Sequence, residues 1–256
     1  MTPSFGCHFF YRPPYHHNHR LPFLFLEPVA NPALTTDFLA MMDARRRELR
    51  ARQSAVLFSS IAPAAATASD SVPSHQTATN PELAQSSPFT WEIGCGHGHF
   101  LTAYAQTHPD EVCIGIDIVG ERIGRAVRKR DRAKLANLHF FHAEARLFLE
   151  TLPHPASFTR LFILFPDPWP KLRHHKHRIL RLDFLTAAAA RAGDGARLYF
   201  RTDYLPYFDD VRVTLSGHLN WLLTEEPWPF EHDTVFQSRA EKFYSLVAKL
   251  HNQTGH

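Results

Sequence analysis

The sequence contains few cysteines and no long hydrophobic run, and both scarcities narrow the class of protein. Its three cysteines, Cys7, Cys95 and Cys113, are odd in number and lack the spacing of a metal-binding motif. They argue against a disulfide framework and favour a reducing compartment. The apolar stretch from Leu21 to Leu26 is too short for a signal peptide or a membrane span. The sequence therefore predicts a cytoplasmic protein with no membrane association.

A strong overall charge is also lacking, because the formal net charge is only +3 over 256 residues. The basic residues are nevertheless concentrated in a few segments, and a local basic patch can attract a polyanion even when the total charge is small. The length suits one sizeable α/β domain with an appendage.

Composition divides the chain into three parts. Residues 1–58 are predicted to be an irregular N-terminal extension with a short basic helix near residues 37–56. Two interpretations of that helix stay open, a contact with nucleic acid and a solvated charged face. Residues 59–88 are rich in Ala, Ser, Thr and Pro and are predicted to be a low-complexity linker. Residues 89–256 are predicted to form the folded domain.

The start of the natural protein is a separate question. Met41 and Met42 lie early in the predicted basic helix, which raises the hypothesis that translation begins there and that residues 1–40 are an artefact of the gene boundaries. Mass spectrometry of the native N-terminus would decide it.

Predicted strands and helices alternate from residue 89 onward, and this alternation is typical of a doubly wound, mostly parallel sheet covered by helices. Ligands of such α/β folds bind outside the carboxyl ends of the strands, which is where the motifs below fall. The predicted strands span 89–93, 112–117, 138–142, 160–165 and 197–201, and the predicted helices span 100–107, 121–134, 145–152 and 183–192.

A glycine-rich turn follows the first predicted strand and includes Gly94, Gly96 and Gly98. Such a turn lets the backbone bend sharply and approach a ligand closely, although NAD sites and simple strand-to-helix packing use similar turns. Glu92, just before the turn, would repel a pyrophosphate but suits the α-amino group of S-adenosylmethionine. Asp117 ends the second predicted strand, where a carboxylate can accept hydrogen bonds from ribose hydroxyls. The pattern favours S-adenosylmethionine over NAD.

Glu144 follows the third predicted strand and has two interpretations. Its carboxylate could meet an adenine amino group, or it could simply open the following helix.

The loop Phe165-Pro166-Asp167-Pro168-Trp169-Pro170-Lys171 follows the fourth predicted strand. Alternating prolines make this loop stiff and extended, so Asp167 would be held over the cofactor pocket. A carboxylate there can accept hydrogen bonds from the N1–H and amino group of guanine and offset positive charge on the ring. Methylation at N7 needs no general base, because N7 carries a free lone pair. Trp169 is expected to pack the loop rather than stack on a base.

A basic run from Lys171 to Arg181 abuts this loop and is predicted to hold RNA phosphates, with a solvated surface as the alternative. Its histidines suggest a metal site as an alternative. No cysteine or carboxylate completes a ligand set, however, so no metal is expected. A second basic cluster, between Arg122 and Lys134, either extends this surface or keeps its helix soluble.

The region from Glu92 onward resembles the bacterial tRNA (guanine-N7-)-methyltransferase family, whose mark is the Phe-Pro-Asp-Pro-Trp-Pro-Lys loop followed by an Arg-His-His-Lys run. The resemblance implies a seven-stranded class I methyltransferase fold and transfer of a methyl group to guanosine 46 of the tRNA variable loop. The implied cofactor-binding residues are Glu92, Gly94, Gly96, Gly98, Asp117 and Glu144. The implied catalytic residue is Asp167, and the implied substrate-binding residues are Lys171, Arg173, Asp203, Thr234 and Gln237.

The chain departs from the family pattern in its last part. The family has a Thr-x-Phe-Glu element, and here Thr234-Val235-Phe236 is followed by Gln237. Glutamine keeps a hydrogen-bond acceptor but lacks the charge. Ala240 replaces the glycine that the family commonly has shortly afterwards, and Asp117 and Glu144 each replace the more common acidic residue by the other one.

Two other functions stay open at this stage. A class I methyltransferase fold also serves other RNAs and small molecules, and a non-catalytic tRNA-binding module could retain the fold. The chain is expected to act as a monomer or homodimer, with tRNA as its partner and no obligate protein partner.

Overall fold

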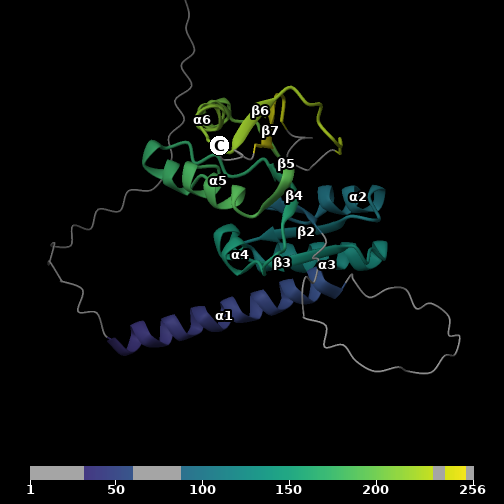
Figure 1. The fold of residues 1–256 in the computed structure, drawn as a ribbon, viewed down its shortest axis with the longest axis vertical. Coiled ribbons are helices and arrows are strands. Elements are labelled where there is room, and N and C mark those ends of the chain that lie inside the picture. Colours follow the sequence, from purple (N-terminus) through teal and green to yellow (C-terminus); the bar gives the residue numbers. More distant parts are fainter. Residues whose placement is uncertain (1–31, 60–87, 233–239, 252–256) are drawn as a thin grey trace, which may run out of the picture. The chain divides into compact units, whose positions relative to one another are not determined.

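The computed structural model describes residues 32–59, 88–232 and 240–251, and it contains a seven-stranded sheet (Figure 1). The chain divides into two units, Met1–Met41 and Met42–His256, and the sheet belongs to the second. The elements are α1 (Pro32–Ser59), β1 (Phe89–Ile93), α2 (His99–Thr107), β2 (Val112–Asp117), α3 (Gly120–Ala133), β3 (Leu138–His142), α4 (Ala145–Thr151), β4 (Phe158–Leu164), the 3-10 helix η1 (Leu172–His177), α5 (Leu182–Ala189), β5 (Ala192–Thr202), α6 (Leu205–Ser216), β6 (Trp221–Thr224) and β7 (Tyr244–Leu250).

The strand order is β3-β2-β1-β4-β5-β7-β6. Strands β1 to β5 pair in parallel, whereas β7 pairs antiparallel with both β5 and β6. The predicted fold class, a doubly wound and mostly parallel seven-stranded sheet, is confirmed. Because β1 lies between β2 and β4, the chain reverses its direction of travel across the sheet at β1, and ligands of such folds bind at this switch point.

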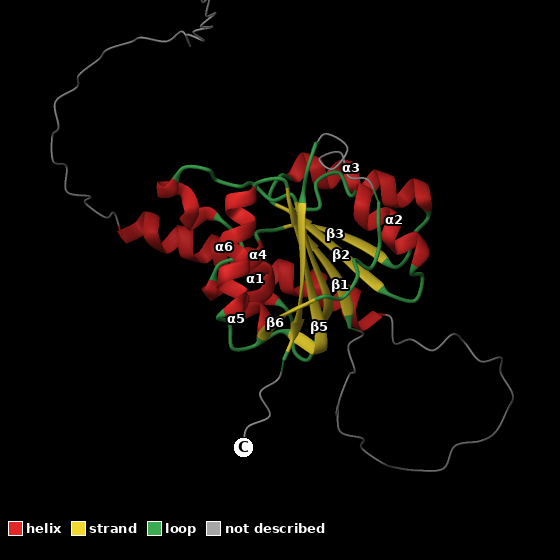
Figure 2. Ribbon diagram, turned by 90° about the horizontal axis from the view of Figure 1, so that it is seen from above, coloured by secondary structure: helices red, strands yellow, loops and turns green. Residues whose placement is uncertain are grey.

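Helices cover both faces of the sheet, as Figure 2 shows, with α2 and α3 on one face and α4, α5 and α6 on the other. Each face has its own buried cluster. On the first face, Phe100 of α2 packs against Phe162 of β4 with ring centroids 4.9 Å apart. On the second, Trp91 of β1 stacks on Phe148 of α4 at 5.1 Å. Strand β2 is buried along its whole length, as expected for a central parallel strand.

The part of α1 that belongs to the second unit packs on the core of the domain. Leu49 and Leu57 are buried in the same cluster as Trp91, and Gln53 Nε2 donates a 2.9 Å hydrogen bond to the carbonyl oxygen of Phe148. The helix spans Pro32–Ser59 and is longer than the predicted 37–56. Its basic side chains, Arg45, Arg46, Arg47, Arg50 and Arg52, are exposed.

The boundary between α5 and β5 differs from the prediction. The helix was expected to reach residue 192, but α5 ends at Ala189 and β5 begins at Ala192. Gly193 and Gly195 follow this start, and Gly195 has a φ of 64°. Glycine is a poor helix former and readily adopts positive φ, so the chain leaves the helix before these residues.

None of the helices in the described ranges has the length and apolar character needed to cross a membrane.

Candidate active site

The glycine-rich turn connects β1 to α2 in a left-handed backbone conformation. Gly94, Gly96 and Gly98 have φ values of 73°, 53° and 68°, which L-residues with side chains adopt at a cost. A Cβ atom at Gly98 would meet the Phe140 ring at 2.6 Å, so this glycine is needed for packing as well. A Cβ atom at Gly94 or Gly96 would meet nothing within 4 Å. The turn therefore keeps its backbone accessible at the carboxyl end of β1.

Glu92 lies just before this turn and is buried, with 4% exposure. Its Oε2 atom has no hydrogen-bond partner among the described residues. Burial and the nearby charge of Asp117 raise the pKa of Glu92 to about 8, while a hydrogen bond from the Leu101 backbone N–H opposes the rise. A buried, unpartnered carboxyl oxygen is costly unless something pairs with it. A cationic group would be a suitable partner for this oxygen.

Asp117 ends β2 and organises the turn from the neighbouring strand. Its Oδ2 accepts a 3.0 Å hydrogen bond from Gly96 N, and its Oδ1 accepts one of 2.8 Å from Val119 N. Arg122 Nη1 lies 3.7 Å from Oδ2. Each carboxylate oxygen can accept a further hydrogen bond, so this arrangement leaves capacity for the two hydroxyls of a ribose.

Replacing Asp117 by alanine is expected to weaken S-adenosylmethionine binding by about 1.5–3 kcal/mol, the usual scale for losing hydrogen bonds to a charged group. Titration calorimetry measures the change. Glu121→Ala is the matched control, because Glu121 is an exposed carboxylate that pairs with Arg125 on α3. Unchanged affinity in Asp117→Ala would contradict the ribose assignment.

Glu144 follows β3 and caps α4. Its Oε2 accepts a 2.9 Å hydrogen bond from Leu147 N, which makes Glu144 the N-cap of the helix. This geometry shows that Glu144 caps the N-terminus of α4. The contact of Glu144 with an adenine amino group stays a prediction, and the exposed position of the side chain at the carboxyl edge of the sheet is compatible with it.

Asp167 lies in the loop that follows β4, and its side chain is exposed. Two neighbours in this loop have positive φ, Phe165 at 48° and Trp169 at 45°. A non-glycine residue in this region is strained and persists only where its surroundings hold it. The Trp169 ring packs against histidines of η1, with centroids 5.8 Å from His174 and 5.0 Å from His177, which agrees with a packing role for Trp169.

Asp203 follows β5, the neighbour of β4, and is exposed. The two carboxylates Asp167 and Asp203 therefore flank the carboxyl ends of adjacent parallel strands. Thr234 and Gln237, the other predicted substrate-binding positions, lie outside the described residues.

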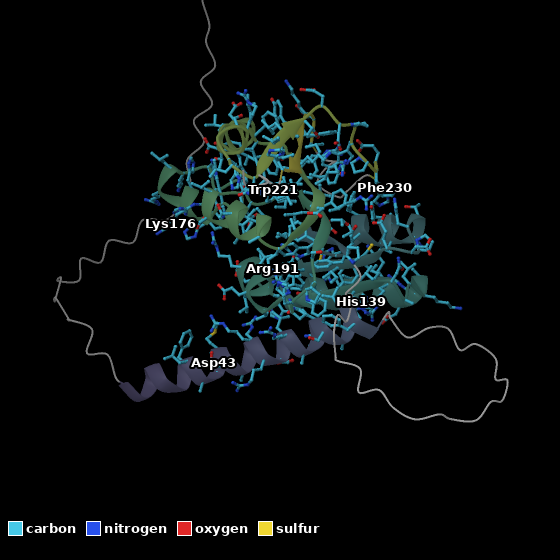
Figure 3. All side chains as sticks on the ribbon, viewed as in Figure 1. Asp43, His139, Lys176, Arg191, Trp221 and Phe230 are labelled. Carbon is cyan, nitrogen blue, oxygen red and sulfur yellow. The ribbon has the colours of Figure 1, made fainter. Side chains whose placement is uncertain are left out.

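Arg201 was not among the predicted site residues. It contacts residues that precede and follow residues 233–239 in the sequence. It is buried at the end of β5 and donates two 2.9 Å hydrogen bonds to the carboxylate of Glu231 and one to Ser245 Oγ. Its guanidinium lies 4.0 Å from the Trp228 ring centroid. Phe230, labelled in Figure 3, packs on α2 next to Phe100 at 5.7 Å. The only signal in the sequence was a charged residue at the end of an apolar strand.

The basic run after the loop forms η1 and the turn beyond it. Lys171 is the N-cap of η1 and Arg173 lies in its first turn, and both are exposed, as are Lys176 and Arg181. In Figure 3 the Lys176 side chain lies at the outer edge of the domain. Arg178 was predicted to bind RNA phosphates as part of this basic run, and that prediction is wrong. Its side chain is only 3% exposed and pairs with Asp210 of α6, so it cannot reach a phosphate.

No cluster of three or more His, Cys, Asp or Glu side chains that could hold a metal ion occurs within the described ranges. Of the histidines of η1, His174 and His177 contact each other and Trp169, and His175 lies beside Asp210.

The sheet order and the carboxylate-flanked glycine turn are those of a class I methyltransferase. A family model described as "Putative methyltransferase" matches residues 86–253. The "tRNA (guanine-N(7)-)-methyltransferase" of Magnetococcus marinus is 37% identical over 174 residues, covering 65% of this chain and 68% of that protein. The chain belongs to the tRNA (guanine-N(7)-)-methyltransferase family.

The coverage is smaller for another protein of the same name. The Streptomyces coelicolor protein of the same name is 34% identical over 131 residues, which cover 51% of this chain and 48% of that protein. The chain thus spans about half the length of this relative. Among solved structures, TrmN from Thermus thermophilus superposes with a TM-score of 0.48 and 17% identity, covering 64% of this chain and 44% of that one.

Proposed function

We propose that this chain transfers a methyl group from S-adenosylmethionine to N7 of a guanosine in tRNA. The observation that carries the proposal is the row of carboxylates at the carboxyl ends of adjacent strands, Glu92 and Asp117 beside the glycine turn and Asp167 across the switch point. The names of the relatives support the choice of acceptor. The loop and basic run that resemble the family imply guanosine 46 as the acceptor. The odd number of cysteines without a metal-binding spacing favours the reducing cytoplasm, where we propose that the enzyme acts as a monomer or homodimer.

The donor supplies an electrophilic methyl group on a sulfonium. Glu92 would hold its α-amino group and Asp117 its ribose hydroxyls. Asp167 would accept hydrogen bonds from the guanine N1–H and amino group, and its charge would offset the positive charge that appears on the ring. N7 carries a free lone pair, so no side chain has to remove a proton. Alignment and charge stabilisation then account for the rate enhancement.

The test is incubation of the full chain with labelled S-adenosylmethionine and unmodified tRNA. Reduction and aniline cleavage then map any 7-methylguanosine to its nucleotide. Label in tRNA that resists this cleavage would mean a different acceptor atom, and no label at all, with cofactor bound, would favour a non-catalytic tRNA-binding module. Cleavage at a guanosine other than 46 would refute only the position.

The exposed part of the basic run is proposed to bind RNA phosphates. Replacing Arg173 and Lys176 together by alanine is expected to weaken tRNA binding and to lower the slope of log affinity against log salt by about 1 to 2, because each lost phosphate contact removes roughly one released counterion. Filter binding over a series of salt concentrations measures this slope.

The matched control is Arg128→Ala with Arg132→Ala, which removes the same charge from exposed positions on α3. An unchanged slope in the η1 variant would make its surface merely solvated. An equal loss in the α3 variant would extend the RNA surface to α3.

A further inference from the structure

We propose that Arg178 is a positioning residue that holds the Asp167 loop in its working conformation, with Asp210 of α6 as its counter-ion. The proposal rests on the proposed function for what the loop does, but its geometric basis is independent. Arg178 follows η1 and lies under the loop rather than on the surface.

The guanidinium of Arg178 reaches the backbone just after Asp167. Its Nε donates a 2.8 Å hydrogen bond to the carbonyl oxygen of Pro168, and one Nη lies 3.5 Å from the carbonyl oxygen of Trp169. These are the two residues that directly follow the candidate catalytic carboxylate. Prolines cannot donate backbone hydrogen bonds, so the loop has few internal hydrogen bonds to define its shape.

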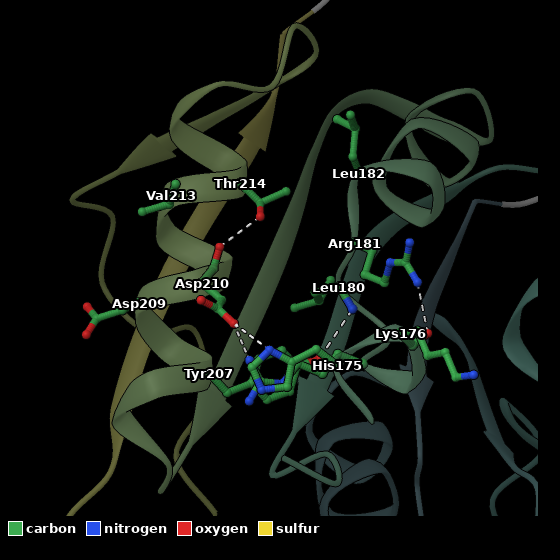
Figure 4. A pocket seen from close by; sticks show the side chains of 11 residues that line it. His175, Lys176, Leu180, Arg181, Leu182, Tyr207, Asp209, Asp210, Val213 and Thr214 are labelled. Atoms are coloured by element: carbon green, nitrogen blue, oxygen red, sulfur yellow. Dashed lines mark hydrogen bonds and ion pairs between the residues drawn. The ribbon is translucent and has the colours of Figure 1, made fainter. Parts of the chain in front are cut away.

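The other side of the guanidinium is fixed by α6. Arg178 Nη1 pairs with Asp210 Oδ2, and the guanidinium carbon lies 4.7 Å from the centroid of the Tyr207 ring. Tyr207 in turn accepts a 3.3 Å hydrogen bond from Leu180 N. Figure 4 shows Asp210, Tyr207 and His175 converging at one side of the cleft between η1 and α6. His175 Nδ1 lies 3.8 Å from Asp210 Oδ2.

This arrangement explains how a strained loop persists. Trp169 has a φ of 45°, and a residue in this region needs tertiary contacts to stay there. A buried arginine is itself costly unless its charge and donors are satisfied, and here the satisfying groups are the loop carbonyls, Asp210 and Tyr207. Arg178 therefore links the loop after β4 to α6, the helix that begins just beyond Asp203.

Lysine keeps the charge at position 178 but cannot donate in several fixed directions from one plane. Arg178→Lys is expected to lower the single-turnover rate of methyl transfer about 10- to 100-fold, the scale for misplacing a reacting group by about an ångström. Its affinity for S-adenosylmethionine should stay within about twofold, because Glu92 and Asp117 are untouched. Asp210→Asn, at a half-exposed position, should slow transfer less, by about three- to tenfold.

Asp209→Asn is the control, because Asp209 is the neighbouring carboxylate on α6 and pairs with Arg212 instead. It should transfer methyl groups at the wild-type rate. Should Arg178→Lys fail to fold, Asp210→Asn compared with Asp209→Asn carries the test.

If Arg178 acts by positioning Asp167, the effects of substituting the two residues should not add. In an Asp167→Asn background, Arg178→Lys should slow transfer by no more than about threefold, because two residues that act as a unit are not additive. Full additivity, or an Arg178→Lys enzyme with normal turnover and a lowered salt slope of tRNA binding, would overturn the proposal.

Hydrogen exchange separates this proposal from the proposed function. The amides of Phe165 and His174 donate hydrogen bonds to Arg201 O and Lys171 O at the two ends of the loop, both of 2.7 Å. They should exchange faster in Arg178→Lys than in the wild type, and no methyl transfer is needed to observe this. Equal exchange would overturn the role of Arg178 even in an active enzyme. Faster exchange in a chain that does not methylate tRNA would support the role of Arg178 and refute the proposed function alone.

Discussion

Replacing Asp167 by asparagine is expected to slow methyl transfer to tRNA by about two to three orders of magnitude, the usual scale for deleting one preorganised electrostatic partner. Asparagine has nearly the shape of aspartate but lacks its charge, and in the proposed role that charge offsets the cation formed on the guanine ring. The loop around Asp167 is held by its prolines and by Arg178, so the neutral side chain should occupy the same place. Single-turnover kinetics with labelled donor measures the rate.

Cofactor binding should be unchanged in Asp167→Asn, since the glycine turn, Glu92 and Asp117 belong to other strands. Asp131→Asn is the control, because Asp131 is an exposed carboxylate on α3 that pairs with Arg130. An Asp167→Asn enzyme that methylates tRNA at close to the wild-type rate would show that the reaction does not need this carboxylate.

Binding of S-adenosylmethionine is expected to release close to one proton near pH 7. The free protein then carries Glu92 largely protonated, because burial and Asp117 raise its pKa to about 8. An ammonium group placed beside Glu92 favours the ionised form, so the proton leaves as the ligand enters. Calorimetry in two buffers of different ionisation enthalpy measures the number of protons released.

The affinity should follow from the same ionisation. Between pH 6 and 8 it should rise on the order of tenfold, and it should stop rising above that range, because the α-amino group of the ligand itself has an ordinary pKa of about 8. Glu92→Gln should bind more weakly at pH 8, release no proton and lose the rise in affinity. Proton release that persists in Glu92→Gln would mean that another group titrates.

Stability of the ligand-free protein should change with pH in the opposite sense. A carboxyl group whose pKa is higher in the folded than in the unfolded state contributes stability below its ordinary pKa, and this contribution is lost as the pH rises through about 8. The melting temperature of the free wild-type chain should therefore fall between pH 6 and 9, and Glu92→Gln should flatten this fall. A wild-type profile as flat as that of the variant would contradict the raised pKa.

Much of the fold could be predicted from local sequence. Strands β1, β2 and β3 begin and end where the sequence analysis expected, since each is a short apolar run between turn residues. Strands β6 and β7 were not located beforehand. Strand β6 has four residues, Leu222 and Leu223 within it are exposed, and both strands form only by pairing antiparallel at the end of the sheet.

The candidate site divides in the same way. The glycine turn, Glu92, Asp117 and Asp167 could be predicted as site residues from the sequence. Each lies at the end of a predicted strand, within a short motif whose residues are adjacent in the chain. Arg178 and Arg201 could not be assigned like this. Both were charged residues in basic or apolar segments, and their partners, Asp210 and Glu231, are distant in sequence.

The sequence by itself thus determined the fold class, the methyl donor and the family, because hydrophobic alternation, glycine placement and the proline-rich loop are local properties of the chain. Only the tertiary structure decided which charges face solvent and which are buried. Arg178 and Lys176 belong to one basic run, yet one is buried beneath the Asp167 loop and the other is exposed. Burial and pairing of a charge depend on what the rest of the chain places around it, and no local pattern encodes that.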